Sequence, residues 1–223
     1  MTRPVLYVLA GVNGAGKSSV GGYLLRRAGF TWFDPDTFAR ELVAATGCRQ
    51  EAANAQAWAE GVRRLDAAVA QGRTHAFETT LGGRTIAAKI LAATRTHDVL
   101  IWFCGLDSPD RHLARVRARV AQGGHDIPES NIRARYPQAQ RNLIDLMPHL
   151  AHLRVYDNSA EAATGDAVPD PVLVLEMAGG RLAWPSVDDR DALERTPEWA
   201  KPLVEAALSL ERFSRTPSSA PSR

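Results

Sequence analysis

Residues 5–20, VLYVLAGVNGAGKSSV, decide the fold of this 223-residue chain. An apolar run ends at Gly11, and the stretch from Gly11 to Ser18 matches G-x-x-x-x-G-K-[ST] at every fixed position. Glycines let the backbone turn back with its N–H groups pointing inward, and the N-terminus of a following helix adds partial positive charge. The pattern therefore predicts a strand, a phosphate-binding loop and a helix over residues 19–27.

The loop residues predict a site for ATP with Mg²⁺. Lys17 is expected to reach the β- and γ-phosphates, with a side chain that is largely solvent-facing when no nucleotide is bound. Ser18 is expected to place its hydroxyl on Mg²⁺. The other candidate nucleotide-binding residues are Gly11, Asn13, Gly14, Ala15, Gly16 and Ser19. An accidental glycine-rich turn is the alternative interpretation.

Composition indicates one domain, expected over residues 1–213, because 45% hydrophobic residues in a chain of this length can bury one core. A formal net charge of +2 gives no support for a nucleic-acid or membrane-surface role. Two cysteines make no disulfide framework, and no apolar run is long enough to cross a membrane. The phosphate loop begins at residue 11, which leaves no room before it for a targeting peptide. We therefore expect a cytoplasmic protein.

Two carboxylates follow a second expected strand, residues 30–33. In the segment DPDT, residues 34–37, either Asp36 or Thr37 could cap a helix that begins near Phe38. The carboxyl ends of strands form the ligand crevice in open α/β sheets. An aspartate there could instead accept a proton from a substrate hydroxyl or orient a metal.

Glu78 and Thr80 end a further expected strand, HAFETT over residues 75–80. A buried carboxylate without a partner is expensive, so Glu78 either contacts a substrate or pairs with an arginine such as Arg84. Other expected helices cover residues 38–46, 51–71 and 84–94, and the apolar run 99–106 is typical of a central parallel strand.

Residues 107–147 form a candidate lid. Seven arginines lie within 31 residues on two expected helices, separated by a loop at Gly123 and Gly124: Arg111, Arg115, Arg117, Arg119, Arg133, Arg135 and Arg141. They form either a solvated basic face or a lid that closes over nucleotide phosphates and excludes water. Beyond it we expect a strand over 153–156, a β-hairpin over 172–184, a helix over 197–213 and a disordered tail over 214–223.

Taken together, the phosphate loop, FDPDTF, FETT, GGHDIP and VYDNS resemble the zeta toxin family of small kinases, from residue 5 to about residue 159. The resemblance implies an α/β phosphate-loop kinase fold: a mostly parallel central sheet with helices on both faces and an arginine-rich helical lid. It also implies ATP-dependent phosphorylation of a hydroxyl of a nucleotide sugar such as UDP-N-acetylglucosamine, and an antitoxin protein as a possible partner.

The resemblance also implies roles for single residues. Asp36 matches the general base of the family, and Glu78 and Thr80 match positions that hold the substrate sugar. Arg84 is a further candidate substrate contact.

In the lid, Arg115 and Arg119 fall where the family places arginines. His125 stands where a second lid arginine is expected, and Arg133 or Arg135 could supply the missing charge.

Two other functions remain open from the sequence. A kinase of this architecture could act on another nucleotide, a metabolite or a polynucleotide end, although a polynucleotide should need a basic, aromatic-bearing track. A regulatory NTPase without any acceptor is the second alternative. The aspartate at Asp36 favours a kinase, because a switch needs no base for an acceptor hydroxyl.

Overall fold

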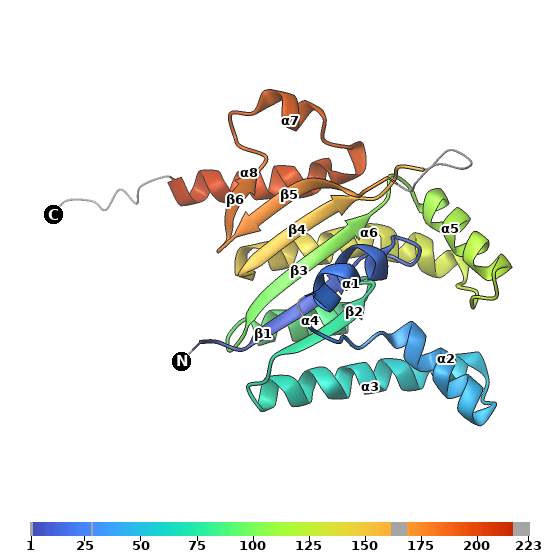
Figure 1. Cartoon of the computed structure of the whole chain (residues 1–223). Helices are drawn as coiled ribbons and strands as arrows, with labels where there is room; N and C mark the ends of the chain where they lie inside the picture. Colours follow the sequence, from blue (N-terminus) through green and yellow to red (C-terminus); the bar gives the residue numbers. More distant parts are fainter. Residues whose placement is uncertain (1, 28, 162–168, 216–223) are drawn as a thin grey trace.

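A sheet of six strands crosses the described part of the chain, in the order β2-β1-β3-β4-β5-β6 (Figure 1). The structure is a computed structural model that describes residues 2–27, 29–161 and 169–215. The strands are β1 (Val5–Ala10), β2 (His75–Thr79), β3 (Asp98–Gly105), β4 (His152–Asp157), β5 (Val172–Ala178) and β6 (Arg181–Trp184). The helices are α1 (Lys17–Arg27), α2 (Pro35–Thr46), α3 (Gln50–Ala70), α4 (Arg84–Ala93), α5 (Pro109–Ala121), α6 (Glu129–Leu146), α7 (Arg190–Glu194) and α8 (Lys201–Arg215), with short 3₁₀ helices η1 (Met147–His149) and η2 (Glu198–Ala200).

Strands β2, β1, β3 and β4 are parallel, and β5 and β6 add an antiparallel hairpin at one edge. Helix α1 packs on one face of the sheet, whereas α4, α6 and α8 cover the other (Figure 1). Helices α2 and α3 pack against each other beside the β2 edge. The predicted α/β architecture, with a mostly parallel sheet, helices on both faces and a C-terminal hairpin and helix, is confirmed.

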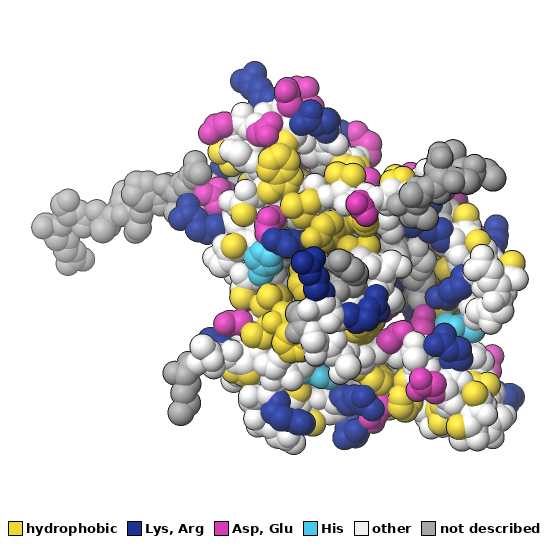
Figure 2. Space-filling model, viewed as in Figure 1, with side chains coloured by type: hydrophobic (Ala, Val, Ile, Leu, Met, Phe, Trp, Pro, Cys, Tyr) yellow, Lys and Arg dark blue, Asp and Glu magenta, His cyan; other side chains and the backbone are white. Residues whose placement is uncertain are grey.

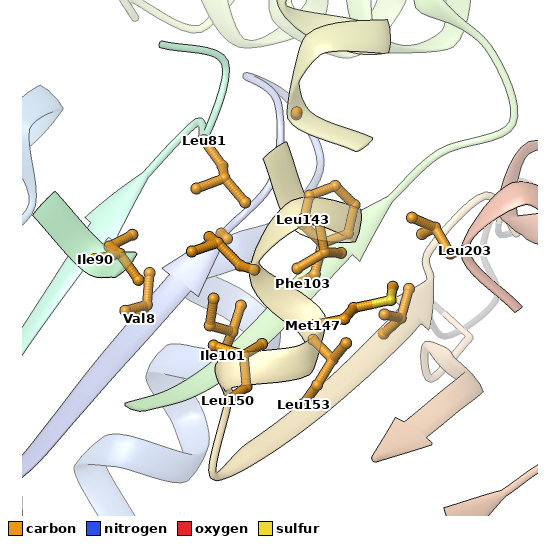
Figure 3. Close-up of a cluster of buried hydrophobic side chains, with 14 of the residues drawn as sticks. Val8, Leu81, Ile90, Ile101, Phe103, Leu143, Met147, Leu150, Leu153 and Leu203 are labelled. Atoms are coloured by element: carbon orange, nitrogen blue, oxygen red, sulfur yellow. The ribbon is translucent and has the colours of Figure 1, made fainter. Parts of the chain in front are cut away.

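The main core lies between the sheet and the helices of its second face (Figure 3). Alternate residues along the strands point into it, as Val8 does from β1 and Ile101 from β3, and Leu143 of α6 meets them. All three side chains are fully buried. Burial of each such side chain contributes about 1.5–3 kcal/mol. This packing fixes the ends of the parallel strands from which the site is built.

The expected strand over residues 30–33 is wrong. Only Phe33 pairs with the sheet, through a single parallel bridge to Phe77. The chain leaves the sheet there because Asp34 caps α2: its carboxylate accepts the Asp36 N–H at 3.0 Å. The helix therefore begins at Pro35, and neither Asp36 nor Thr37 is the cap.

The boundaries of two predicted segments can be compared with the structure. Leu143 and Leu146 of α6 belong to the core, as do Leu113, Val116 and Ile132 earlier in residues 107–147, so burial does not set off one part of this segment as a lid, and the lid stays a prediction. Ser214 and Arg215 belong to α8, whereas the rest of the predicted tail, residues 216–223, lies outside the described residues. Within the described ranges, no helix has the length and apolar character needed to span a membrane.

Candidate functional site

The phosphate loop between β1 and α1 is held in place by the end of β4. Gly11, Gly14 and Gly16 have φ angles of 140°, 84° and 86°, a region that side chains disfavour. Asn158, just after β4, donates its amide to the Ala15 carbonyl at 2.9 Å. A Cβ on Gly16 would lie only 2.4 Å from that amide nitrogen. Glycine at this position lets the loop and the VYDNS segment pack together.

His112 of α5 contacts the phosphate loop through a hydrogen bond, a role that the sequence did not predict. The buried ring donates from Nδ1 to the Asn13 carbonyl at 2.8 Å. Burial lowers the pKa of His112 to about 4, and the charges of Lys17 and Arg115 act in the same direction, although the bond to Asn13 opposes them. The ring is therefore neutral near pH 7. In the sequence, His112 is one polar residue among the arginines of α5, and no pattern marks it as a contact of the phosphate loop.

We expect the protein to lose stability as the pH falls from about 6.5 towards 4. The unfolded chain protonates this histidine near its ordinary pKa of 6.5, whereas the folded chain does so only near 4. Below pH 6.5 the unfolded state thus binds more protons than the folded state, so the stability falls as the pH falls. The contribution of the neutral ring is fully lost once the pH has fallen through the folded pKa. Melting temperatures against pH for the wild type and His112→Gln, which cannot titrate, check this. An identical pH dependence in both proteins would contradict it.

Lys17, Ser18 and Glu78 form a polar group at the carboxyl ends of β1 and β2, in which Lys17 and Glu78 are buried and Ser18 is exposed. Lys17 Nζ lies 3.3 Å from Glu78 Oε1, and the Ser18 hydroxyl donates to Glu78 Oε2 at 2.9 Å. Only 8% of Lys17 and 9% of Glu78 is exposed. The expectation of a solvent-facing Lys17 is therefore wrong, because a carboxylate buried at this place requires a counter-charge.

The ion-pair partner of Glu78 is accordingly Lys17 and not Arg84. Arg84 is exposed at the start of α4 and does not line the cavity described below. The sequence alternatives for Glu78 were a substrate contact or an arginine pair, and contact with the phosphate loop itself was not among them.

The oxygen atoms beside the loop fit Mg²⁺. This ion is typically bound through one or two carboxylates together with substrate phosphates and water. The Ser18 hydroxyl and the Glu78 carboxylate provide such oxygens 2.9 Å apart. Over the described ranges, no group of three His, Cys, Asp or Glu side chains could hold a metal by itself. Magnesium would therefore be held by Ser18 and Glu78 jointly with the nucleotide.

A cavity of about 210 Å³ opens beside the loop, next to α2 and α3. It brings together seven of the sixteen candidate site residues that the sequence singled out, from five separate segments. Those on its lining are Asn13, Lys17, Asp36, Glu78, Thr80, His125 and Arg135. Arg84, Arg115 and Arg119 do not line it, although Arg119 reaches one of its residues.

Asp36 is the point at which the lid meets α2. Arg119 Nη1 lies 3.5 Å from Asp36 Oδ2, and His125 Nε2 lies 3.9 Å from Asp36 Oδ1. Figure 2 shows acidic, basic and histidine side chains gathered on the side where α2 and α5 approach each other. The buried Nε of Arg119 has no hydrogen-bond partner among the described residues. The expected lid arginine and His125 thus both lie at the predicted base.

The other lid arginines, Arg115, Arg133 and Arg135, make contacts in different parts of the structure. Arg135 Nη1 donates to Asn13 Oδ1 at 2.8 Å and so adds positive charge beside the phosphate loop. Arg115 donates to the carbonyl of Asn158 at 2.7 Å. Arg133 pairs with two carboxylates at the surface and does not line the cavity. Of the two alternatives for the missing lid charge, Arg135 is therefore in position and Arg133 is not.

The cavity also has an apolar lining that the sequence did not predict. Its larger members are Phe33, Trp58, Val62, Phe77, Ile86 and Ile127. In α3, Trp58 stands in a run rich in alanine, four residues before Val62 and seven before Leu65, so helical spacing places it on the same face as these apolar residues. The residue type and this spacing were the signals in the sequence, but they do not say which face of α3 lies beside the site.

Comparison with solved structures concerns the fold. Among solved structures, the chain is similar to one of AvrRxo1-ORF1:-ORF2 with ATP (TM-score 0.63, 16% identity) and to one from the PezAT chromosomal toxin–antitoxin system of Streptococcus pneumoniae (TM-score 0.58, 14% identity). The alignments cover 89% and 95% of this chain, and 64% and 86% of those chains. The chain thus spans less than two thirds of the first of them. At these identities the likenesses show a shared fold, which agrees with the α/β fold that the resemblance to the zeta toxin family implies.

Sequence comparison gives a narrower result. No curated protein matches the chain. One family model, described as an AAA domain, matches residues 6–141, which include the phosphate loop, β2, β3 and the lid. Because this match spans more than half of the 223 residues, the chain belongs to the AAA domain family.

Proposed function

We propose that the chain is an ATP-dependent phosphotransferase that acts on a hydroxyl group of a small molecule. The observation that carries this proposal is the position of Asp36 on the same cavity as Lys17. A carboxylate facing the phosphate loop across a cavity can accept the proton of an acceptor hydroxyl. A protein that only hydrolyses ATP as a switch has no acceptor hydroxyl from which this carboxylate would take a proton.

In the proposed reaction, Asp36 takes the hydroxyl proton while the acceptor oxygen forms a bond to the γ-phosphorus. The bond from that phosphorus to the bridging oxygen breaks, and ADP leaves. Lys17 and Arg119 stabilise the negative charge on the transferred group. When bound, Mg²⁺ supplies further positive charge along the phosphates. Arg119 lies 3.5 Å from Asp36, so it must turn from this carboxylate towards the phosphates before the base is free.

The resemblance to the zeta toxin family leads to a finer proposal. The acceptor is a nucleotide sugar such as UDP-N-acetylglucosamine, and the chain is the toxin of a toxin–antitoxin pair in the cytoplasm. Support comes from the similar structures, one of which belongs to a toxin–antitoxin system and another of which contains two different proteins, ORF1 and ORF2.

Phosphoryl transfer to a panel of acceptors tests the proposal. The protein is incubated with Mg-ATP and a set of nucleotide sugars, nucleotides, nucleosides and simple sugars, and mass spectrometry detects the gain of one phosphoryl group. We expect one class to be phosphorylated. ATP hydrolysis at a rate that no acceptor changes would contradict the proposal and favour the regulatory NTPase.

Arg119→Lys should lower kcat at least about tenfold, equivalent to about 1.4 kcal/mol of transition-state stabilisation, with little change in ATP affinity. Lysine keeps the charge but loses the planar fork that holds two phosphate oxygens. Steady-state kinetics and ATP binding for the variant check this. The matched control is Arg117→Lys, two residues earlier on α5, where the side chain is exposed and pairs with Glu129. Equal kcat in Arg119→Lys and wild type would assign Arg119 to a solvated face.

A further inference from the structure

The cavity has two chemically different sides, separated by β2. The phosphate loop follows β1, on one side of β2, and Phe33 bridges to the other side of that strand at Phe77. Among the described lining residues, the lysine and arginine are Lys17 and Arg135. Both are beside the loop, because Lys17 belongs to it and Arg135 bonds to its Asn13. The side formed by Phe33, α3 and α4 therefore offers no positive charge to an occupant.

Phe33 forms a fixed part of the apolar side. Only 6% of it is exposed, and its ring packs 5.6 Å from that of Phe38. The guanidinium of Arg64 lies 4.7 Å from the ring centroid. Gly61 of α3 permits this packing, since a Cβ there would lie 2.9 Å from the ring. The ring of Phe33 is thus held from several sides and belongs to the wall of the cavity.

Trp58 differs from Phe33, because it lines the cavity but 54% of it remains exposed. Asn54 and Val62, one helical turn before and after it, line the same cavity, so the indole lies on the face of α3 that is directed to the site. An exposed tryptophan at the opening of a cavity presents a large flat apolar surface, and the described residues leave 54% of this one uncovered. The amide of Asn54 lies on the same face and can bond to polar edges of a ring.

The size of the cavity limits what can be enclosed. A cavity of about 150 Å³ accommodates benzene in another protein. The volume here, about 210 Å³, is enough for one ring-sized group beside Asp36. Any second group of the acceptor must extend to the opening, where Trp58 is.

We propose that the acceptor carries an uncharged, planar heteroaromatic ring that stacks on Trp58 while its reacting hydroxyl lies beside Asp36. The proposal rests on the proposed function for the identity of Asp36 as the base, and it adds a binding subsite formed by Trp58 and Asn54. Stacking on an aromatic side chain does not depend on which planar ring is bound. It is strong enough to select ring-bearing acceptors over polyols and simple sugars. The absence of a lysine or arginine from the described apolar lining disfavours a negatively charged group at this end.

Equilibrium binding without ATP tests the subsite directly. The probes are uridine and adenosine, which carry planar rings, and glucose and gluconate, which do not. They are titrated into the wild type, Trp58→Ala and Trp58→Phe, with calorimetry and tryptophan fluorescence as readouts. The matched control is Trp184→Phe, because Trp184 is also a partly exposed tryptophan, 38% exposed, but lies on β6 and does not line the cavity.

We expect a ring-bearing probe to bind and to quench the tryptophan fluorescence of the wild type. This quenching should be lost in Trp58→Phe and retained in Trp184→Phe. Trp58→Ala should weaken its binding at least about fivefold, the lower end of measured base–aromatic stacking, and Trp58→Phe should weaken it less. Binding of glucose and gluconate should not change. Equal binding of the ring probes by Trp58→Ala and wild type would overturn the proposal, as would wild-type protein that binds no ring probe at millimolar concentration.

The outcomes separate this proposal from the proposed function. Ring-bearing compounds that bind in a Trp58-dependent manner but never gain a phosphoryl group would contradict the phosphotransferase and leave the subsite standing. Phosphoryl transfer to a simple sugar at a rate that Trp58→Ala does not change would overturn the subsite and leave the phosphotransferase standing.

Discussion

Asp36→Asn should lower the rate of phosphoryl transfer about 10²–10⁴-fold, the usual effect of losing a general base. Asparagine keeps the size of the side chain but cannot accept the hydroxyl proton. Stability should scarcely change, because the capping side chain of α2 is Asp34 and not Asp36. Turnover of the phosphorylated acceptor, ATP binding and the melting temperature are measured on the same preparation. We expect a protein that binds ATP and melts normally but transfers almost nothing.

Asp34→Asn is the matched control. Asp34 accepts hydrogen bonds from the Asp36 N–H at 3.0 Å and the Thr37 hydroxyl at 2.7 Å, and asparagine is an equally good N-cap residue. This variant should keep most of its activity. An inactive Asp34→Asn with a fully active Asp36→Asn would show that the base is misassigned. Wild-type turnover in both variants would contradict the phosphotransferase itself.

Lys17→Ala should lower activity about 10²–10³-fold, the effect of removing one group that stabilises charge in the transition state. It should also lower the melting temperature, a consequence that the sequence did not predict. In the folded protein, Lys17 lies 3.3 Å from Glu78, and both are buried. Removing the lysine leaves an uncompensated buried carboxylate, which typically costs about 3–5 kcal/mol. Enzyme assays and thermal unfolding of the variant measure the two effects.

The double variant Lys17→Ala/Glu78→Gln distinguishes the two effects. It removes both charges, so the melting temperature should recover in part while activity stays low. Full activity in Lys17→Ala would contradict its role at the phosphates. A loss of stability that Glu78→Gln does not relieve would show that the buried ion pair is not its cause.

The phosphate loop could be predicted from the sequence because its geometry is local. Its glycines, lysine and serine lie within eight residues, and the strand and helix beside them follow from short-range patterns. The pairing of Lys17 with Glu78 could not be predicted in this way. It depends on the register of β1 and β2, in which Leu9 lies opposite Glu78. That register is set by packing across the sheet, which no stretch of sequence contains.

The lid arginines show the same limit. Arg133 and Arg135 are two residues apart and equally basic, yet one pairs with surface carboxylates and the other reaches Asn13. On a helix such neighbours point in different directions, but the sequence does not say which direction faces the cavity. Asp36 was predicted as the base from its place after an expected strand and from the resemblance of its segment to a known family, and this role stays a prediction. Trp58 was missed because its role depends on which face of α3 lies beside the site.

Helix α6 runs from the lid to the core and contains Pro137. Proline has no N–H, so one hydrogen bond of the helix is missing at this point, and bending costs least there. Leu143 and Leu146, after the proline, are fixed in the core, whereas Arg135 precedes it. Ile132, before the proline, is also fully buried in the same core, so both halves of α6 are anchored. A bend at Pro137 that carried Arg135 towards or away from the phosphates would therefore have to repack Ile132, and the core holds this cation at a set place beside the phosphate loop.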